Sequence, residues 1–266
     1  MFRNYFKIAL RKMGKHKGDT AINLVGLCVA FTCALLLFLS VFFEFSYDNF
    51  HKNESRIYHL YTNVSGKDGI RSATSTSVPM IPTLKATYPE VEYGCRYISK
   101  NGNIRYKDKQ ITQNLRLTDP DFFSMFSFPF VNGSAKSALN ELSSLVLTSR
   151  SAKAIFGEEE AMGKTVQMQV GGEWKPFIVT GILENIPDNS SITFDMVGRF
   201  ETDENYAANT AEWTNWNHSA YVQLKENVSP SDLVNKATPF YNQHFAEDIQ
   251  NMKRDGIKPI TGGAYM

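Results

Sequence analysis

The longest uninterrupted run of apolar residues lies near the start of the chain, at residues 21–43. It carries no charge, and only Asn23, Thr32 and Ser40 are distinctly polar. A helix of about 23 residues at about 1.5 Å per residue reaches roughly 35 Å, enough to cross the hydrocarbon core of a bilayer. The run is longer than the apolar part of a signal peptide, and "FEFSYDNF" after it has no small-residue cleavage site. The pattern therefore favours a retained transmembrane helix at residues 21–43 over a cleaved signal peptide.

Residues 1–20 alternate apolar and basic positions with the spacing of a helix. The apolar side chains are Phe2, Tyr5, Phe6, Ala9, Leu10 and Met13, and the basic ones are Arg3, Lys7, Arg11, Lys12, Lys15 and Lys17. Such a segment is typical of an amphipathic helix on a membrane surface, with a plain basic leader as the alternative. No acidic residue precedes Asp19, so the positive-inside rule predicts that residues 1–20 are cytoplasmic. Residues 44–266 are then expected in the periplasm, beyond the bacterial inner membrane.

After residue 44 the hydrophobic pattern switches between the periods of strand and helix, which predicts an α+β domain. Strands are predicted at residues 56–64, 92–99, 103–118, 143–149, 165–170, 174–186, 191–200 and 219–225. Helices are predicted within residues 78–88, 119–126 and 150–157 and after residue 229. Asp119 is the expected N-cap of the second helix, with Pro120 at its first position, and Gly157 is the expected end of the third. Gly171 and Gly172 predict a hairpin turn.

The charge balance limits the kinds of binding partner, and the cysteine content limits the disulfides that the chain can form. The chain has 28 Lys and Arg residues against 27 Asp and Glu, a net charge of +1, so no nucleic-acid partner is expected. Cys28 and Cys33 lie in the apolar run, and Cys95 is the only cysteine beyond it. A single cysteine makes no intramolecular disulfide, so the outer domain must be held by its hydrophobic core. About 220 residues are ample for such a core.

One stretch, "GEEEAMGKTVQM", resembles a phosphate-binding loop (P-loop). A true P-loop here would indicate that the chain is an ATPase. A P-loop needs four residues between its glycines, but five separate Gly157 from Gly163. The residues after Lys164 alternate as in a strand, whereas a P-loop lysine must open a helix whose amides bind phosphate. The pattern therefore predicts a helix end, an acidic turn and a strand, and no nucleotide site.

Other catalytic patterns are absent from the sequence, so no catalytic, cofactor or metal residue is assigned and no enzyme activity is expected. No G-x-S-x-G or H-E-x-x-H motif occurs. Trp213 and Trp216 near His218 are better explained by packing than by a ligand cage. Asp119 and Asp121 are better explained by helix capping than by acid–base catalysis. The histidines lack metal-ligand spacing and are expected at the surface or in the core: His16, His51, His59, His218 and His244.

The basic start and the single apolar span are followed by "YDNFHKNESRIYHLY". This N-terminal part looks like the N-terminus of MacB/FtsX-type ABC transporter permeases. "LTDPDFFSMFSFPFVNGSAKSAL", "SLVLTSRSAKAIFGEEEAMGKTVQM" and "VTGILENIPDNSSITFDM" are similar to its later segments, in family order. The resemblance implies a MacB-like periplasmic core domain with an α/β porter part, at about 47–99 and 191–252, and a β-rich insert at about 100–190.

Two hypotheses of function follow. The resemblance implies the N-terminal portion of a permease subunit, which passes the energy of ATP hydrolysis in a cytoplasmic ABC ATPase to a periplasmic domain. Its expected partners are that ATPase, a second permease copy or half, membrane lipid, and a periplasmic substrate or adaptor. Family members carry further membrane helices, whereas this sequence shows no second apolar span. The alternative is a single-pass membrane-anchored sensor or binding module that works without an ATPase.

Overall fold

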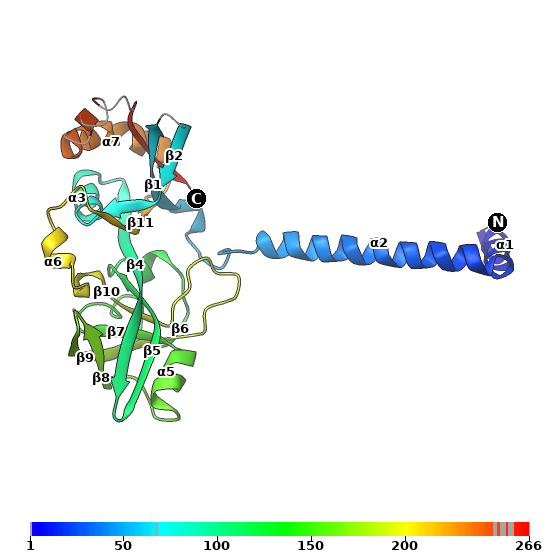
Figure 1. Cartoon of the computed structure of the whole chain (residues 1–266), viewed down its shortest axis with the longest axis horizontal. Helices are drawn as coiled ribbons and strands as arrows, with labels where there is room; N and C mark the ends of the chain where they lie inside the picture. Colours follow the sequence, from blue (N-terminus) through cyan, green and yellow to red (C-terminus); the bar gives the residue numbers. More distant parts are fainter. Residues whose placement is uncertain (1, 67–68, 247–248, 251–253, 255–257, 266) are drawn as a thin grey trace. The chain divides into compact units, whose positions relative to one another are not determined.

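The computed structural model of the chain describes residues 2–66, 69–246, 249–250, 254 and 258–265. The chain divides into two compact units, a helical unit at Met1–Asp48 and a sheet unit at Asn49–Met266 (Figure 1).

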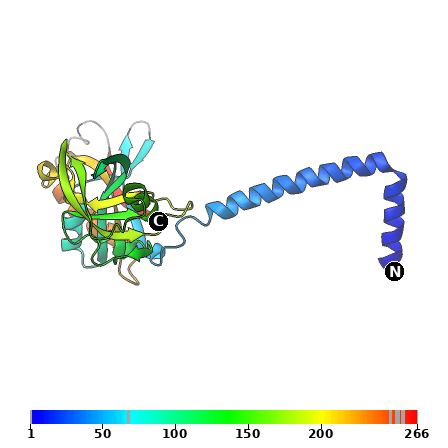
Figure 2. The ribbon, with the colours of Figure 1, turned by 90° about the horizontal axis from the view of Figure 1, so that it is seen from below.

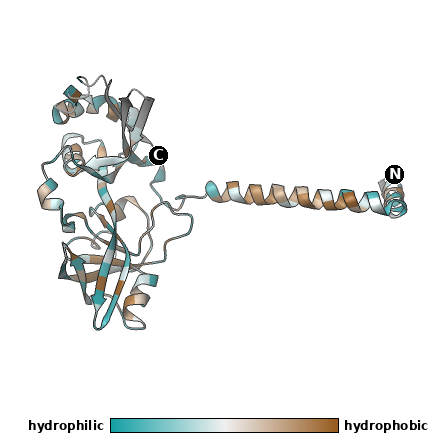
Figure 3. Cartoon of the chain, in the orientation of Figure 1, coloured by the Kyte–Doolittle hydropathy of each residue, from teal (hydrophilic) through white to brown (hydrophobic). Residues whose placement is uncertain are grey.

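The helical unit consists of α1 (Phe2–Lys15) and α2 (Lys17–Glu44), which meet at a sharp bend at His16 (Figure 2). At the bend, the Thr20 hydroxyl donates a hydrogen bond to the Met13 carbonyl at 3.0 Å. None of the side chains of α2 is buried, although apolar residues run along most of its length (Figure 3). Such a surface is unfavourable in water. Among the described residues, α2 is the one helix long and apolar enough to cross a membrane.

The sheet unit is built on one large mixed sheet with the strand order β12-β1-β11-β4-β5-β10-β7-β9-β6. β2 pairs with β1, β3 pairs with β11, and β8 joins β4 to β9. The strands are β1 (Ile57–Gly66), β2 (Gly69–Ala73), β3 (Ser75–Ser77), β4 (Val91–Tyr106), β5 (Lys109–Thr118), β6 (Phe130–Asn132), β7 (Ser144–Thr148), β8 (Thr165–Val170), β9 (Glu173–Leu183), β10 (Met196–Arg199), β11 (Trp216–Leu224) and β12 (Lys258–Tyr265).

Short helices connect and cover these strands. They are η1 (Glu54–Arg56), α3 (Met80–Thr87), α4 (Phe122–Met125), α5 (Ser149–Phe156), η2 (Phe200–Thr202), α6 (Tyr206–Asn209) and α7 (Pro230–His244). β4 runs from the end of the unit that carries α3 and α7 to the end that carries β8, β9 and α5 (Figure 1), and β5 pairs with it along residues 97–106. β4 therefore links both ends of the sheet unit.

The buried side chains form three hydrophobic clusters along this pair of strands. The first packs α3 and α7 on β1, β4 and β11 and includes Tyr58, Ile81, Leu84, Val222, Leu233 and Phe240. The second lies around α4 and includes Cys95, Phe122, Met125, Phe128, Val146 and Phe194. The third lies beneath α5 and β7–β9 and includes Ile104, Leu115, Leu147, Phe156, Met168 and Val179. Apolar burial of this extent stabilises the unit without a disulfide, and Cys95 is a free thiol.

The local turn chemistry agrees with the sequence at two glycine positions. Gly157 follows α5 with φ +67° and ψ −121°, a region that residues with a Cβ rarely adopt, so the helix ends there. Gly171 and Gly172 both have positive φ, +59° and +84°, and form the turn between β8 and β9. Positive φ at both central residues suits the right-handed twist of a hairpin.

Two strand predictions differ from the structure. Residues 92–99 and 103–118 were expected as strands with turns between them, but β4 continues unbroken from Val91 to Tyr106 before turning into β5. Asn-Gly is a common turn sequence, yet β5 pairs with β4 across both Asn101 and Gly102. Residues 191–200 were expected as one strand, but only Met196–Arg199 pairs.

Candidate functional site

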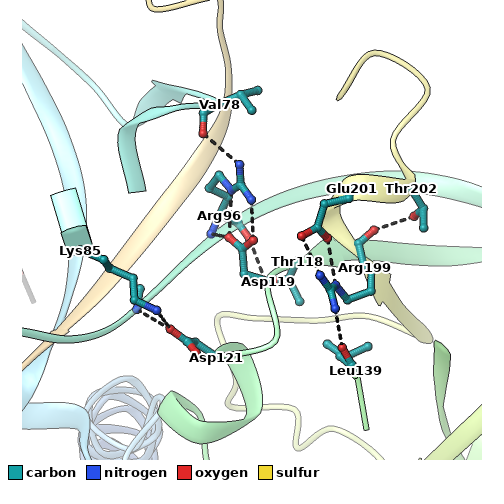
Figure 4. A network of polar contacts seen from close by, with 11 residues as sticks. Val78, Lys85, Arg96, Thr118, Asp119, Asp121, Leu139, Arg199, Glu201 and Thr202 are labelled. Carbon is teal, nitrogen blue, oxygen red and sulfur yellow. Dashed lines mark hydrogen bonds and ion pairs between the residues drawn. The ribbon is translucent and has the colours of Figure 1, made fainter. Parts of the chain in front are cut away.

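Among the described residues of the sheet unit, Arg96 of β4 is the charged residue least exposed to solvent. Its side chain forms a bidentate ion pair with Asp119. The Arg96 Nε atom lies 2.9 Å from Asp119 Oδ2, and a terminal guanidinium nitrogen lies 2.6 Å from Oδ1 (Figure 4). The Arg96 backbone N–H also donates to Asp119 Oδ2 at 2.7 Å, and the remaining terminal nitrogen donates to the Val78 carbonyl at 2.9 Å. The ring of Phe200 covers the guanidinium at 4.4 Å. Arg96 thus joins β4 to the β5–α4 connection and to the segment before α3.

The predicted capping role of Asp119 is wrong. The N-cap of α4 is Asp121, and no side chain makes a capping hydrogen bond there. The Asp119 carboxylate faces Arg96 instead, because a buried guanidinium requires a counter-charge at close range. Asp121 also serves β4: its carboxylate accepts a hydrogen bond from the Gly94 N–H at 3.1 Å and pairs with Lys85 of α3. Both carboxylates therefore fix the position of β4.

A second arginine–carboxylate pair lies at the end of β10. Arg199 donates to Glu201 through Nε at 2.9 Å and through a terminal nitrogen at 2.7 Å. Its other terminal nitrogen donates to the Leu139 carbonyl at 3.0 Å (Figure 4). This pair ties η2 and the loop before β7 to the sheet.

His218 of β11 is buried beside this network. Its Nδ1 lies 2.8 Å from the Asn217 side-chain oxygen, and its ring lies edge-on to Phe200, with centroids 4.9 Å apart. Burial, together with the charge of Arg96, lowers the pKa of His218 to about 4. The histidine is therefore neutral near pH 7 and adds no charge to the network.

The network contains no group arranged for nucleophilic or acid–base catalysis. Both oxygens of Asp119 accept hydrogen bonds from Arg96, and both oxygens of Glu201 accept them from Arg199. Geometry of this kind holds strands and loops in register. The sequence pattern does not point to Arg96, Arg199 or Glu201, because isolated charged residues inside strand patterns give no motif that pairs them.

The residues that the sequence singled out are dispersed. Among the described residues, no group of three His, Cys, Asp or Glu side chains could hold a metal ion. Trp213 and Trp216 pack against Phe240 and Phe245 in the cluster around α7, as the sequence indicated.

The loop that resembled a P-loop has no phosphate-binding geometry. Lys164 pairs with Glu159 at 2.5 Å, and β8 begins at Thr165, so no helix N-terminus follows the lysine. The side chains of Lys107 and Lys164 together lower the pKa of Glu159 to about 2. The three groups form a surface ion-pair cluster.

The comparisons with known proteins agree on the class of the sheet unit. Residues 20–240 match the family model of the MacB-like periplasmic core domain. A domain of a protein assigned as a permease, from Porphyromonas gingivalis, matches with a TM-score of 0.68 at 22% identity, covering 81% of this chain and 91% of that one. The extracellular domain of the ABC-type transporter YknZ from Gram-positive bacteria matches with a TM-score of 0.52 at 14% identity, covering 79% and 100%.

A third structure, the periplasmic region of MacB from Actinobacillus actinomycetemcomitans, has a TM-score of 0.48 at 18% identity, covering 71% of this chain and 85% of that one. No curated protein matches the sequence significantly. At these identities the first two structures establish the fold, and the family model, which covers more than half of the chain, establishes the family. The chain therefore belongs to the family of the MacB-like periplasmic core domain of ABC-type transporter permeases, carried here behind one apolar N-terminal helix.

Proposed function

We propose that the chain is the N-terminal portion of a permease subunit of an ABC transporter. In this proposal α1 lies on the cytoplasmic surface of the inner membrane, α2 crosses it, and the sheet unit lies in the periplasm. A cytoplasmic ATPase subunit hydrolyses ATP, and the helices pass the movement to the sheet unit. The family match carries the proposal, and the fully exposed apolar helix α2 supports it.

We further propose that the sheet unit consists of a porter part, at about 47–99 and 191–252, and an insert at about 100–190. The cluster around α3 and α7 draws its buried residues from Tyr58 to Val91 and from Ala220 to Phe245. The cluster beneath α5 draws them from Ile104 to Ile182, and Met196 joins it from the second porter range. Residues 247–248 and 251–252 of the porter range lie outside the described residues. The continuous strand β4 and the Arg96–Asp119 pair at the junction favour movement of both parts as one body.

The proposal is tested by identifying the proteins that copurify with the chain and by measuring ATP hydrolysis in the purified sample. The chain is tagged in its native bacterium, crosslinked in the membrane and purified, and the sample is assayed for ATP hydrolysis and analysed by mass spectrometry. We expect a separate subunit with a P-loop and ATPase activity. The tagged Asn49–Met266 unit, exported without α1 and α2, is the matched control and should carry neither. A full chain that brings down no nucleotide-binding protein and no hydrolysis contradicts ATP coupling and favours the single-pass sensor.

A further inference from the structure

One edge of β4 is left without a partner strand for six residues. β11 pairs with β4 as far as Tyr97, and β8 pairs with it only at Ile104 and Arg105. Between these points, at residues 98–103, the described chain pairs only the opposite edge of β4, with β5. In an antiparallel pair, alternate residues turn their N–H and C=O groups away from the partner. The open edge therefore presents backbone donors and acceptors that can pair with another strand.

A cavity of about 280 Å³ lies along this open edge. Its apolar lining comes from Leu115, Leu117, Met168 and Val170. The gap exists because β8 diverges from β4 after Met168 and turns back at the Gly171–Gly172 hairpin, while the segment after η2 closes the other side. The cavity thus combines an apolar lining with an unpaired strand edge, which are the two features needed for strand addition by a peptide.

The rim of the cavity has an excess of negative charge. Lys100 pairs with Asp203 at 2.5 Å and lies 3.6 Å from Glu204. One lysine therefore faces two carboxylates. The Asp203 side chain is only 9% exposed and is held by Lys100, whereas the Glu204 side chain is 50% exposed. Glu204 is thus the carboxylate that can meet a positive charge on a ligand.

We propose that this cavity binds an extended peptide segment that adds as a strand to residues 98–103 of β4 and places a basic side chain against Glu204. Apolar side chains of the peptide would contact Leu115, Leu117 and Met168. The site is independent of ATP coupling, so it holds whether the chain serves in a permease or as an anchored binding protein.

The experiment uses the full chain in detergent micelles and three fluorescein-labelled peptides. The first is Thr-Val-Lys-Val-Thr, the second has glutamate in place of lysine, and the third is the lysine peptide with its backbone amides N-methylated. Binding is measured by fluorescence anisotropy, and hydrogen exchange of residues 98–103 is measured with and without peptide. Glu204→Gln removes the exposed charge, and Asn101→Trp places a bulky group at an exposed position on the cavity lining. Glu158→Gln, at an exposed carboxylate outside the cavity lining, is the matched control.

We expect the lysine peptide to bind and to slow hydrogen exchange at residues 98–103. Glu204→Gln should weaken it about threefold, the effect of one exposed ion pair, and N-methylation should weaken it about tenfold or more through lost hydrogen bonds. Asn101→Trp should block binding, and Glu158→Gln should leave it unchanged. Equal binding of the methylated or the glutamate peptide overturns the proposal. So does an absence of binding at millimolar lysine peptide, or binding without protection of residues 98–103.

Discussion

Arg96, Arg116 and Arg199 of the sheet unit lose most of their contact with water, and their charges are compensated in two different ways. Arg96 is held by both oxygens of Asp119, and Arg199 by both oxygens of Glu201. Arg116, within the described residues, has no carboxylate at ion-pair distance. It donates to the Thr193 carbonyl at 2.9 Å and lies over the ring of Tyr97 at 4.6 Å. Burial accordingly lowers the pKa of Arg116, although the group stays charged.

The Arg96–Asp119 pair gives the sharpest prediction for a single residue. Asp119→Asn leaves a buried guanidinium without its counter-charge and should lower the free energy of unfolding by about 3–5 kcal/mol. Arg150→Gln breaks an ion pair whose arginine is 75% exposed and is the matched control, with an expected loss below about 1 kcal/mol. Urea denaturation of the chain, followed by circular dichroism, measures both. Equal losses of unfolding free energy in the two variants would show that the buried Arg96–Asp119 pair stabilises the chain no more than an exposed ion pair does.

The lowered pKa of His218 leads to a prediction of how the free energy of unfolding depends on pH. Its pKa is lowered by burial to about 4 in the folded chain, below the ordinary value of 6.5, so the unfolded chain binds the proton more readily between these values. The stability contributed by the neutral ring is therefore present above about pH 6.5 and is lost as the pH falls toward 4. The loss should reach about 2 kcal/mol at pH 5. Comparing unfolding at pH 7 and pH 5 should show a smaller pH effect in His218→Gln than in the unchanged chain. The same pH dependence in both would remove His218 as its cause.

At the scale of elements, β4 organises the sheet unit. It pairs with β11 at one end, with β5 along residues 97–106, and with β8 at Ile104 and Arg105. Its side chains contribute to all three clusters through Val91, Cys95 and Ile104. One continuous strand therefore connects the two ends of the unit.

The structure at Lys164 predicts the behaviour of the chain toward nucleotide. A strand follows the lysine, and Glu159 pairs with it, so no cradle of backbone amides for phosphate is present at this loop. ATP binding to the purified chain should be at background, and Lys164→Ala should leave it there, as measured by isothermal titration calorimetry with and without Mg²⁺. Micromolar affinity that disappears in Lys164→Ala would refute this account of the loop.

Elements whose formation depends on neighbouring residues could be predicted from the sequence. The apolar span, the Gly157 stop, the Gly171–Gly172 turn and the alternation of β8 each depend on neighbouring residues. The continuity of β4 was missed because its partner β5 overrides the local preference of Asn101 and Gly102 for a break. The Arg96–Asp119 pair was missed because it joins residues 23 apart in the chain, and charge pairing across a sheet leaves no periodic signal.

At the scale of the whole chain, the two units require different surroundings. The sheet unit buries its apolar residues in three clusters and needs no disulfide. The helical unit buries none of the apolar side chains of α2, so α2 is the part of the described chain that is suited to a bilayer by its length and apolar surface. Basic residues at the N-terminal side of α2, with Asp19 the first acidic residue, set the expected direction of insertion.

The location of the sheet unit on the outer side of the inner membrane is the central claim, and thiol labelling tests it most directly. Cys95 is fully buried, and Cys28 and Cys33 lie in α2, so the latter two are replaced by serine and one exposed cysteine is introduced. Glu158→Cys reports on the sheet unit and Gly14→Cys on the basic segment, both at exposed positions. In cells with a permeabilised outer membrane, a membrane-impermeant maleimide should label position 158 at once and position 14 only after the inner membrane is broken. Labelling in the reverse order would contradict the account.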